Sequence, residues 1–318
     1  MTQATREFVP AYLSQLEGGE LSARVDAAFA RLEACDLCAH YCLVNRRKTI
    51  RGAVCRTGEQ AVVHSFGAHH GEEDPLRGWR GSGTLFFSWC NLRCVFCQNW
   101  EISQKGIGRP VAPEELAAMM LELQAEGCHN INLVSPSHVV AQIIAAVDLA
   151  AKNGLHLPLV YNTGGYDSAE ALALLDGIID IYMPDMKYGD SSLARRYSKI
   201  RNYVAINRAA VKEMHRQVGD LMLDDRGIAQ RGLLVRHLVL PQQLAGTEQV
   251  LAFLAEEISP HTYLNLMDQY HPCYRADEYP PLARSLSKEE YTAALQLARR
   301  SGLTRLDRCA YRFEAGTN

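Results

Sequence analysis

Three cysteines in the first third of the chain have a spacing that suits metal binding. Cys90, Cys94 and Cys97 follow the pattern C-x3-C-x2-C, directly after the hydrophobic run 84–89. Three thiolates on one short loop can bind three corners of a cubane [4Fe–4S] cluster, because cysteine thiolates are the usual ligands of such clusters. The fourth iron then lacks a protein ligand and can bind another molecule. Zinc is the alternative, but a structural zinc site needs four N or S ligands, and no fourth ligand is close in sequence.

Four further cysteines precede this motif and could bind a second metal centre. Cys35, Cys38, Cys42 and Cys55 follow the spacing C-x2-C-x3-C-x12-C, and a glycine lies three residues to either side of the last one. Four thiolates complete a tetrahedral zinc site or saturate a second [4Fe–4S] cluster. The first three cysteines are compatible with a cluster, whereas the Gly-x2-Cys turn resembles a zinc ribbon. Both zinc and a second cluster therefore remain open.

Composition restricts the class of protein. The 318 residues are 47% hydrophobic and 22% charged, with a net charge of -3, and seven of the ten cysteines lie between Cys35 and Cys97. These values are ordinary for a globular protein that is large enough to bury a core. Because disulfides are rare in a reducing cytoplasm, clustered cysteines indicate metal binding. The slight acidity gives no reason to expect general nucleic-acid binding.

The N-terminal residues do not resemble a signal peptide. Residues 1–13 include Arg6 and Glu7 and lack an apolar core, and no run of about 18 apolar residues, the length of a membrane span, occurs in the chain. We therefore expect a cytoplasmic protein without a membrane partner.

Short hydrophobic runs alternate with amphipathic stretches from residue 84 onward. Runs expected to be strands lie at 84–89, 130–135, 158–163, 178–186, 233–240 and 263–270. Stretches with helical periodicity lie near 113–126, 139–152, 168–175, 191–217, 247–258 and 287–301. Alternating β and α elements imply a parallel sheet with right-handed crossovers, and six units favour an α/β fold with a partial (β/α)6 barrel. Chemistry in such barrels lies at the C-terminal ends of the strands.

The N-terminal part has a different pattern. Apolar residues recur at helical spacing over residues 4–33, interrupted at Gly18 and Gly19, and the four-cysteine segment follows. We expect residues 1–80 to form helices and a four-cysteine metal-binding segment. Residues 81–318 are expected to form the partial barrel with a C-terminal extension.

The three-cysteine motif resembles the signature of the radical S-adenosylmethionine (SAM) superfamily, C-x3-C-x-aromatic-C, with Phe96 in the aromatic position. The resemblance implies that SAM binds the open iron of a [4Fe–4S] cluster. It also implies that SAM is cleaved reductively to a 5′-deoxyadenosyl radical, which abstracts hydrogen from a substrate. The chain is most similar to the pyruvate formate-lyase activating enzyme group, in its PflX-type branch, at the segments 97–100, 185–187, 236–241 and 267–272.

The resemblance also implies a SAM pocket at the strand ends. Asp185 and Lys187 match an Asp-x-Lys motif whose residues contact the methionine part of SAM, and side chains at i and i+2 of a strand point the same way. Arg236 begins a similar arginine motif, and His271 matches a pocket histidine. The pair Asn162–Thr163 occupies the place of an Asp-Thr pair that meets the ribose or the amino group. The alternatives are a structural ion pair for Asp185 and Lys187, a surface ion pair for Arg236 and a core histidine for His271.

The chain departs from the family pattern at one contact. The family often has Gly-Gly-Glu after its second strand, where the glutamate holds the SAM amino group, whereas this chain has Ser135-Pro-Ser137-His. We expect a hydroxyl of Ser135 or Ser137, or a backbone carbonyl, to replace the glutamate. Cys273 is a candidate hydrogen-atom donor to a substrate radical, with packing or surface exposure as the alternative.

Substrate and partners follow from the resemblance alone. Activating enzymes act on a glycine of a partner protein, which implies a protein or peptide substrate and an electron donor such as flavodoxin or ferredoxin. Radical modification of a small molecule or of another macromolecule is the second hypothesis. A non-catalytic iron–sulfur or zinc protein that transfers electrons or serves as a scaffold is the third.

Overall fold

The computed structural model describes residues 8–307. Within them, six parallel strands form an open arc, in the order β2, β4, β5, β6, β8 and β9. Each strand overlaps one of the six hydrophobic runs, so the α/β fold with a mostly parallel sheet is confirmed. Their bounds are β2 Ser82–Phe87, β4 Ile131–Val134, β5 Leu159–Thr163, β6 Ile181–Pro184, β8 Ala229–Leu238 and β9 Tyr263–Met267.

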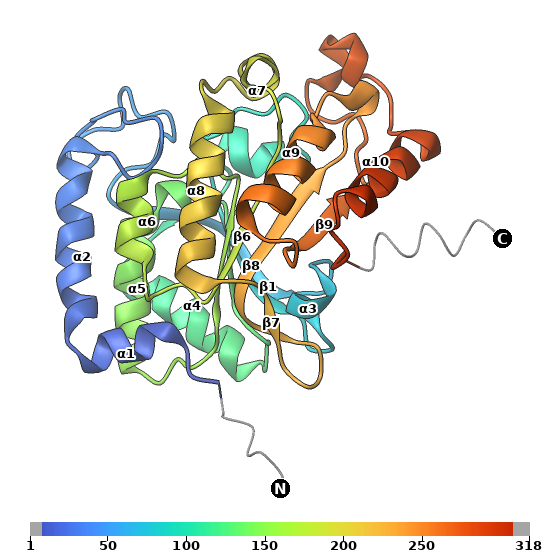
Figure 1. Cartoon of the computed structure of the whole chain (residues 1–318). Coiled ribbons are helices and arrows are strands. Elements are labelled where there is room, and N and C mark those ends of the chain that lie inside the picture. Colours follow the sequence, from blue (N-terminus) through green and yellow to red (C-terminus); the bar gives the residue numbers. More distant parts are fainter. Residues whose placement is uncertain (1–7, 308–318) are drawn as a thin grey trace, which may run out of the picture.

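Helices cover the outer face of this sheet (Figure 1). They begin and end close to the expected positions, at α4 Pro113–Ala125, α5 Val140–Lys152, α6 Ala169–Leu175, α7 Ser191–Ser198, α8 Tyr203–Val218, α9 Thr247–Phe253 and α10 Lys288–Arg300. The single helix expected at 191–217 is wrong, because α7 and α8 are separate. Lys199 and Asn202, between them, have φ values of 60° and 54°, which lie in the left-handed region and end a right-handed helix.

Two N-terminal helices pack on the barrel. Helices α1 (Ala11–Glu17) and α2 (Glu20–Ala30) separate at Gly19, whose φ of 73° suits glycine. Helix α2 lies along α5, and Figure 1 shows the two side by side. The backbone amide of Ala11 donates to Asp180 at 2.8 Å, and the Tyr12 hydroxyl donates to the carbonyl of Leu157 at 3.0 Å. The expected break between two helices is confirmed, while residues 4–7 of the predicted stretch lie outside the described part.

An antiparallel extension of the sheet was not expected. Strand β1 (Ala61–His69) pairs with β2, with Val63 opposite Phe87 and His69 opposite Ser82, and β3 (Arg109–Val111) pairs with β1. Helix α3 (Asp74–Arg77) follows β1, and β7 (Met222–Leu223) pairs with β8. Since β1 runs against β2, the loop 70–73 lies at the N-terminal end of β2, whereas the Cys90 loop follows its C-terminal end.

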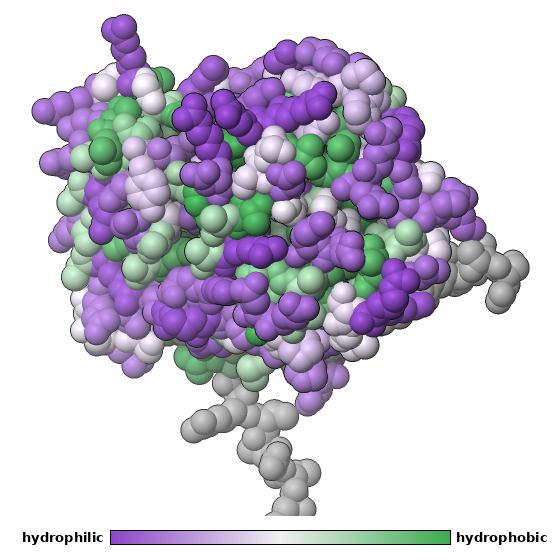
Figure 2. All heavy atoms as spheres, turned by 45° about the horizontal axis from the view of Figure 1, so that its top comes forward, coloured by the Kyte–Doolittle hydropathy of each residue, from purple (hydrophilic) through white to green (hydrophobic). Residues whose placement is uncertain are grey.

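Short 3-10 or π-helical turns complete the fold, at Arg31–Ala34, Glu101–Lys105, Pro136–His138, Pro241–Gln243, Leu254–Ile258, Ala276–Glu278 and Pro280–Leu282. Within residues 8–307, no helix has the length and apolar character needed to cross a membrane. Hydrophilic residues cover most of the face shown in Figure 2, with smaller hydrophobic areas between them.

Candidate metal and cofactor site

The three-cysteine loop begins directly after β2. Hydroxyl and amide groups surround its sulfur atoms: Cys94 Sγ lies 3.0 Å from Ser198 Oγ, and Cys97 Sγ lies 3.1 Å from Ser103 Oγ. The backbone amide of Leu92 donates to Cys90 Sγ at 3.4 Å. Hydrogen-bond donors around thiolate ligands tune iron–sulfur clusters. The set of three thiols with these polar neighbours therefore fits three corners of a [4Fe–4S] cluster.

The electrostatic setting of these thiols also suits a metal centre. Burial raises the pKa of Cys94 to about 12, although the nearby charge of Lys187 opposes this shift. Burial likewise raises the pKa of Cys90. A buried thiol loses its proton readily only beside a strong positive charge, which a bound metal would provide.

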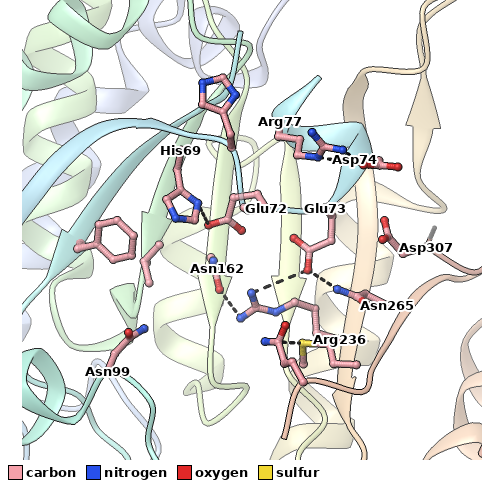
Figure 3. Close-up of a pocket in the computed structure, with 16 residues that line it drawn as sticks. His69, Glu72, Glu73, Asp74, Arg77, Asn99, Asn162, Arg236, Asn265 and Asp307 are labelled. Carbon is pink, nitrogen blue, oxygen red and sulfur yellow. Dashed lines mark hydrogen bonds and ion pairs between the residues drawn. The ribbon is translucent and has the colours of Figure 1, made fainter. Parts of the chain in front are cut away.

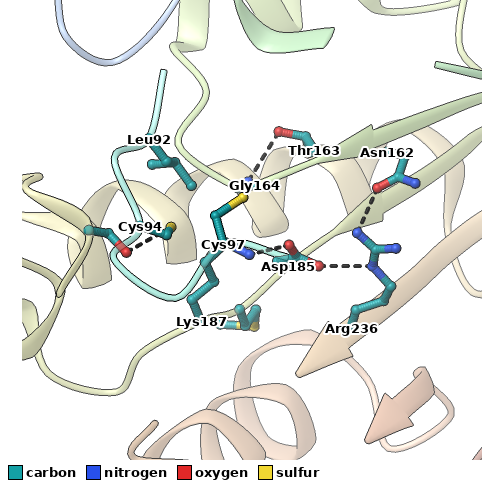
Figure 4. A network of polar contacts seen from close by, with 12 residues as sticks. Leu92, Cys94, Cys97, Asn162, Thr163, Gly164, Asp185, Lys187 and Arg236 are labelled. Carbon is teal, nitrogen blue, oxygen red and sulfur yellow. Dashed lines mark hydrogen bonds and ion pairs between the residues drawn. The ribbon is translucent and has the colours of Figure 1, made fainter. Parts of the chain in front are cut away.

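Asp185, Lys187, Arg236 and Asn162 form one polar network beside the three-cysteine loop (Figure 4). Arg236 Nε donates to Asp185 Oδ1 at 2.8 Å, and Arg236 Nη2 donates to Asn162 Oδ1 at 2.7 Å. Lys187 Nζ forms an ion pair with the other carboxylate oxygen of Asp185. The structure thus brings together four of the expected SAM-pocket residues, from the ends of β5, β6 and β8.

Asp185 is the acidic centre of this network. Burial opposes ionisation of its carboxyl group, but Arg236 and Lys187 together hold the pKa of Asp185 below its usual value. Two cations therefore share one carboxylate, and the network keeps positive charge available for an anionic ligand group such as a carboxylate.

Most of the hydroxyl groups expected to contact SAM are buried and form hydrogen bonds within the protein. Ser137 Oγ lies 2.9 Å from Thr163 Oγ1, which donates to buried Asp167 at 2.7 Å. Ser137 and Thr163 are 2% and 1% exposed, so their hydroxyls serve Asp167 in this structure. Ser135 is half-buried, and its backbone amide donates to the carbonyl of Asn162 at 2.9 Å. Of the two serines, Ser135 therefore has the more accessible side chain.

The segment after β9 lies against the three-cysteine loop but outside the Asp185 network. His271 is exposed, and its Nδ1 lies 3.4 Å from the side-chain nitrogen of Gln98. Cys273 is half-buried, and burial together with the nearby charge of Cys97 raises its pKa. The ring of Tyr274 stacks on Trp100 at a centroid distance of 5.3 Å. The roles expected for His271 and Cys273 stay predictions.

A cavity of about 520 Å³ opens beside Arg236 and Asn162. Its opposite wall is the segment 69–74, which contributes Glu72 and Glu73 (Figure 3). The sequence reasoning missed these glutamates. Two adjacent acids after a glycine were the available signal, but only the antiparallel pairing of β1 places them inside the barrel.

The second cysteine group surrounds a buried arginine. Cys35, Cys38 and Cys55 are buried, Cys42 is half-buried, and Arg46 is only 2% exposed. Arg46 donates to Cys35 Sγ at 3.4 Å and to the backbone carbonyls of residues 57 and 58 at 2.7 and 3.2 Å. Among residues 8–307, no carboxylate contacts Arg46. A buried guanidinium needs a negative partner, and metal-bound thiolates would provide one.

The two cysteine groups are direct neighbours. His40, between Cys38 and Cys42, has its Nε2 2.6 Å from the carbonyl of Asn91. Arg93, next to Cys94, donates to the carbonyl of Val54. Within residues 8–307, no group of three or more His, Cys, Asp or Glu side chains is arranged to hold a metal ion. The assignment of metal sites to the two cysteine groups therefore rests on the type and spacing of their thiols.

Comparison with known proteins identifies the family. The model of the radical SAM superfamily matches residues 84–253. The chain is similar to "Uncharacterized protein MJ0674" of Methanocaldococcus jannaschii, with 34% identity over 293 residues that cover 89% of this chain and 79% of the relative. It is 23% identical to "Uncharacterized protein MJ0808" of the same organism over 284 residues, which cover 80% of this chain and 78% of that protein.

The chain also matches solved structures at low sequence identity. A radical SAM methyltransferase from Sphaerobacter thermophilus is 14% identical, with a TM-score of 0.45 and coverage of 92% of this chain and 90% of that one. Methylornithine synthase (PylB) is 14% identical, with a TM-score of 0.44 and coverage of 95% and 82%. On the match of the family model to more than half of its residues, the chain belongs to the radical SAM superfamily.

Proposed function

We propose that this protein is a radical SAM enzyme that binds a [4Fe–4S] cluster through Cys90, Cys94 and Cys97 and abstracts hydrogen from a substrate in the cavity beside Arg236. The observation that carries the proposal is the Lys187–Asp185–Arg236 network next to the three-cysteine loop (Figure 4). When bound, the cluster and SAM would supply an electron and a hydrogen-abstracting radical, while the protein binds, orients and excludes water.

Each residue of the network has a role that its geometry supports. Lys187 and Arg236 attract the carboxylate of SAM, and Asp185 holds both cations in place. Asn162 Oδ1 accepts from Arg236 at 2.7 Å; its amide nitrogen can donate to a ribose oxygen, or its oxygen can accept a second hydrogen bond from the amino group. Ser135 is the candidate replacement for the missing glutamate, because it is half-buried and its backbone is bonded to Asn162.

The finer activity is also a proposal. Resemblance to activating enzymes supports formation of a glycyl radical on a partner protein. The cavity of about 520 Å³ supports a small molecule or one extended segment of a peptide as the substrate. A polar, partly charged lining is better suited to a polar substrate than to a lipid.

The four cysteines at the N-terminal end are proposed to bind zinc or a second [4Fe–4S] cluster. Buried Arg46 beside Cys35 supports thiolate ligation, because it provides positive charge with no carboxylate contact among the described residues. The contact of His40 with Asn91 supports a structural or electronic link to the first site.

An acidic electron donor such as flavodoxin or ferredoxin is the proposed partner. Arg93 and Val95, on either side of Cys94, line a surface pocket of about 310 Å³ together with Arg56, Lys199 and Arg275. A group of cations beside the cluster loop would attract an acidic redox protein.

Anaerobic reconstitution with iron and sulfide, followed by dithionite and SAM, tests the central proposal. We expect formation of 5′-deoxyadenosine. Cys94→Ala should abolish it, whereas Cys38→Ala should leave the first cluster and the cleavage of SAM in place. An intact, reduced cluster that binds SAM without cleaving it would contradict the proposal.

A further inference from the structure

The cavity beside Arg236 contains a pair of glutamates that the SAM-binding network does not use. Glu72 and Glu73 follow β1 and point into the barrel from its N-terminal side, opposite Arg236 (Figure 3). Glu73 is 6% exposed, and the side chain of Glu72 is 9% exposed. Two adjacent carboxyl groups held this deeply are costly unless they serve a ligand or a strong internal partner.

Some polar atoms around these glutamates have no protein partner. Oε1 of Glu73 accepts from Asn265 Nδ2 at 2.8 Å, but its Oε2 is buried without a hydrogen bond. Oδ1 of Asn265 is in the same state. A buried polar atom without a hydrogen bond destabilises the fold. Both of these atoms, on Glu73 and Asn265, are acceptors and call for hydrogen-bond donors.

The charges that face the cavity leave an acidic excess. Arg236 lies 4.0 Å from Glu73 but is bonded more closely to Asp185, and Arg77 donates to Asp74 at 2.9 Å. The two glutamates therefore account for this excess: Asp307 accepts from the Tyr263 hydroxyl at 3.1 Å, and the other titratable lining groups are His69 and His70, of which His69 lies 3.5 Å from Glu72.

Burial raises the pKa values of Glu72 and Glu73, against the opposing charge of Arg236. A cation bound between the two carboxyl groups would stabilise their ionised forms.

Arg236 connects this pair to the proposed SAM pocket. Its guanidinium contacts Asp185 and Asn162 on one side and faces Glu73 on the other. A group bound between the glutamates therefore places the neighbouring carbon atoms of the same molecule in the cavity beside the three-cysteine loop, whose residue Asn99 also lines it.

We propose that this cavity binds the substrate through a cationic amine or guanidinium group, held by Glu72 and Glu73 and by the side-chain carbonyl oxygen of Asn265. The inference rests on the proposed function and adds the chemical class of the substrate. The cation belongs either to a small molecule or to a lysine or arginine side chain of a peptide, because both present the same group to the site.

A purely structural role is the competing explanation. The bond between Glu73 and Asn265 ties the loop after β1 to β9 and closes the open side of the barrel. That role needs only one oxygen of Glu73 and leaves its second oxygen and Oδ1 of Asn265 without a hydrogen bond. Glu73→Gln keeps an oxygen that accepts from Asn265 but removes the charge, so it separates the two roles.

The test measures binding of simple probes to the reconstituted protein with SAM present. The probes are 1,5-diaminopentane, agmatine, the uncharged 1,5-pentanediol and a short peptide with one central lysine. We expect at least one cationic probe to bind and the diol to bind at least tenfold more weakly. We expect Glu72→Gln and Glu73→Gln to weaken binding of the cationic probe about tenfold. Glu114→Gln, at an exposed position of α4, is the matched control. Tighter binding of the peptide than of the free amines identifies a side chain as the source.

Three results would overturn the inference: no binding of any cationic probe, equal binding of the diol, or unchanged affinity in both glutamine variants. A loss of SAM affinity in Glu73→Gln would also overturn it, because Glu73 would then hold the SAM amino group. Failure of SAM cleavage with intact amine binding would instead contradict the proposed function alone.

Discussion

At the scale of single residues, Asp185 decides the charge of the site. It is 8% exposed and contacts two cations, and these two hold its pKa below the usual value despite burial. A carboxyl group with a lowered folded-state pKa stabilises the protein above its unfolded pKa, near 3.9, and this contribution is lost as pH falls through the lower folded value. Removal of one partner from a buried ion pair typically costs about 3–5 kcal/mol.

Asp185→Asn should therefore lower the free energy of unfolding at pH 7 by several kcal/mol and weaken SAM binding, since Lys187 and Arg236 lose their common anchor. The difference from the wild type should begin to shrink below about pH 4, where the Asp185 carboxyl becomes protonated in the unfolded chain, and should be lost as pH falls through the lower folded value. Denaturant unfolding over a pH series measures this. Asp176→Asn removes an exposed ion pair with Arg216 at 2.5 Å, and should cost under about 1 kcal/mol. Equal effects of the two changes would refute the role of Asp185.

At the scale of elements, the sequence predicts the strands and helices whose positions follow from the pattern of hydrophobic residues. The six parallel strands are buried on both faces, so each reads as a continuous apolar run. Strand β1 escaped prediction because its second half is partly exposed and contains Ser65, Gly67 and His69. The break between α7 and α8 escaped it because residues 199–202 contain neither Gly nor Pro, the usual signals.

Among the candidate site residues, the sequence predicts those with a local signal and misses those that depend on distant contacts. Cysteine spacing predicts metal ligands locally, and strand alternation predicts that Asp185 and Lys187 point the same way, as their ion pair requires. Glu72, Glu73 and Arg46 escaped because their roles depend on contacts with distant segments, such as the bond from Asn265 to Glu73 across 192 positions. Periodicity does not encode such contacts.

The cysteine-rich segment 35–58 gives a prediction at this scale. In a Cys90/Cys94/Cys97→Ala background, the four-cysteine group should retain its metal. Arg46→Gln in this background should reduce the metal content at least severalfold, because the buried thiolates lose their positively charged neighbour. Arg47→Gln is the matched control, since Arg47 is half exposed and pairs with Glu33 and Glu59 at the surface. Elemental analysis of zinc and iron reads out both identity and amount. Equal metal in the two arginine variants would remove Arg46 from the site.

At the scale of the whole molecule, the described parts converge on one face of the barrel. The three-cysteine loop, the four-cysteine segment and the segment after β9 meet there. His40 of the four-cysteine segment contacts the carbonyl of Asn91, and the backbone amide of Arg275, after β9, donates to the carbonyl of Val95 at 2.9 Å. The cavity beside Arg236, which we propose binds the substrate, is lined from the loop side by Asn99, and the basic pocket with Lys199 and Arg275 lies at the surface. Electrons and substrate would therefore approach from different directions.

This separation predicts that reduction and substrate binding respond to different mutations. Lys199→Glu with Arg275→Glu should slow reduction by an acidic flavodoxin severalfold at low salt, and rising ionic strength should reduce the difference, because exposed charges are screened. Reduction by dithionite, which needs no protein docking, should change little, and so should binding of the cationic probes. Lys212→Glu, at an exposed position of α8 paired with Glu257, is the matched control. Stopped-flow absorbance of the cluster measures the rates. If the double variant reacts with flavodoxin as fast as the control, the donor docks elsewhere on the surface.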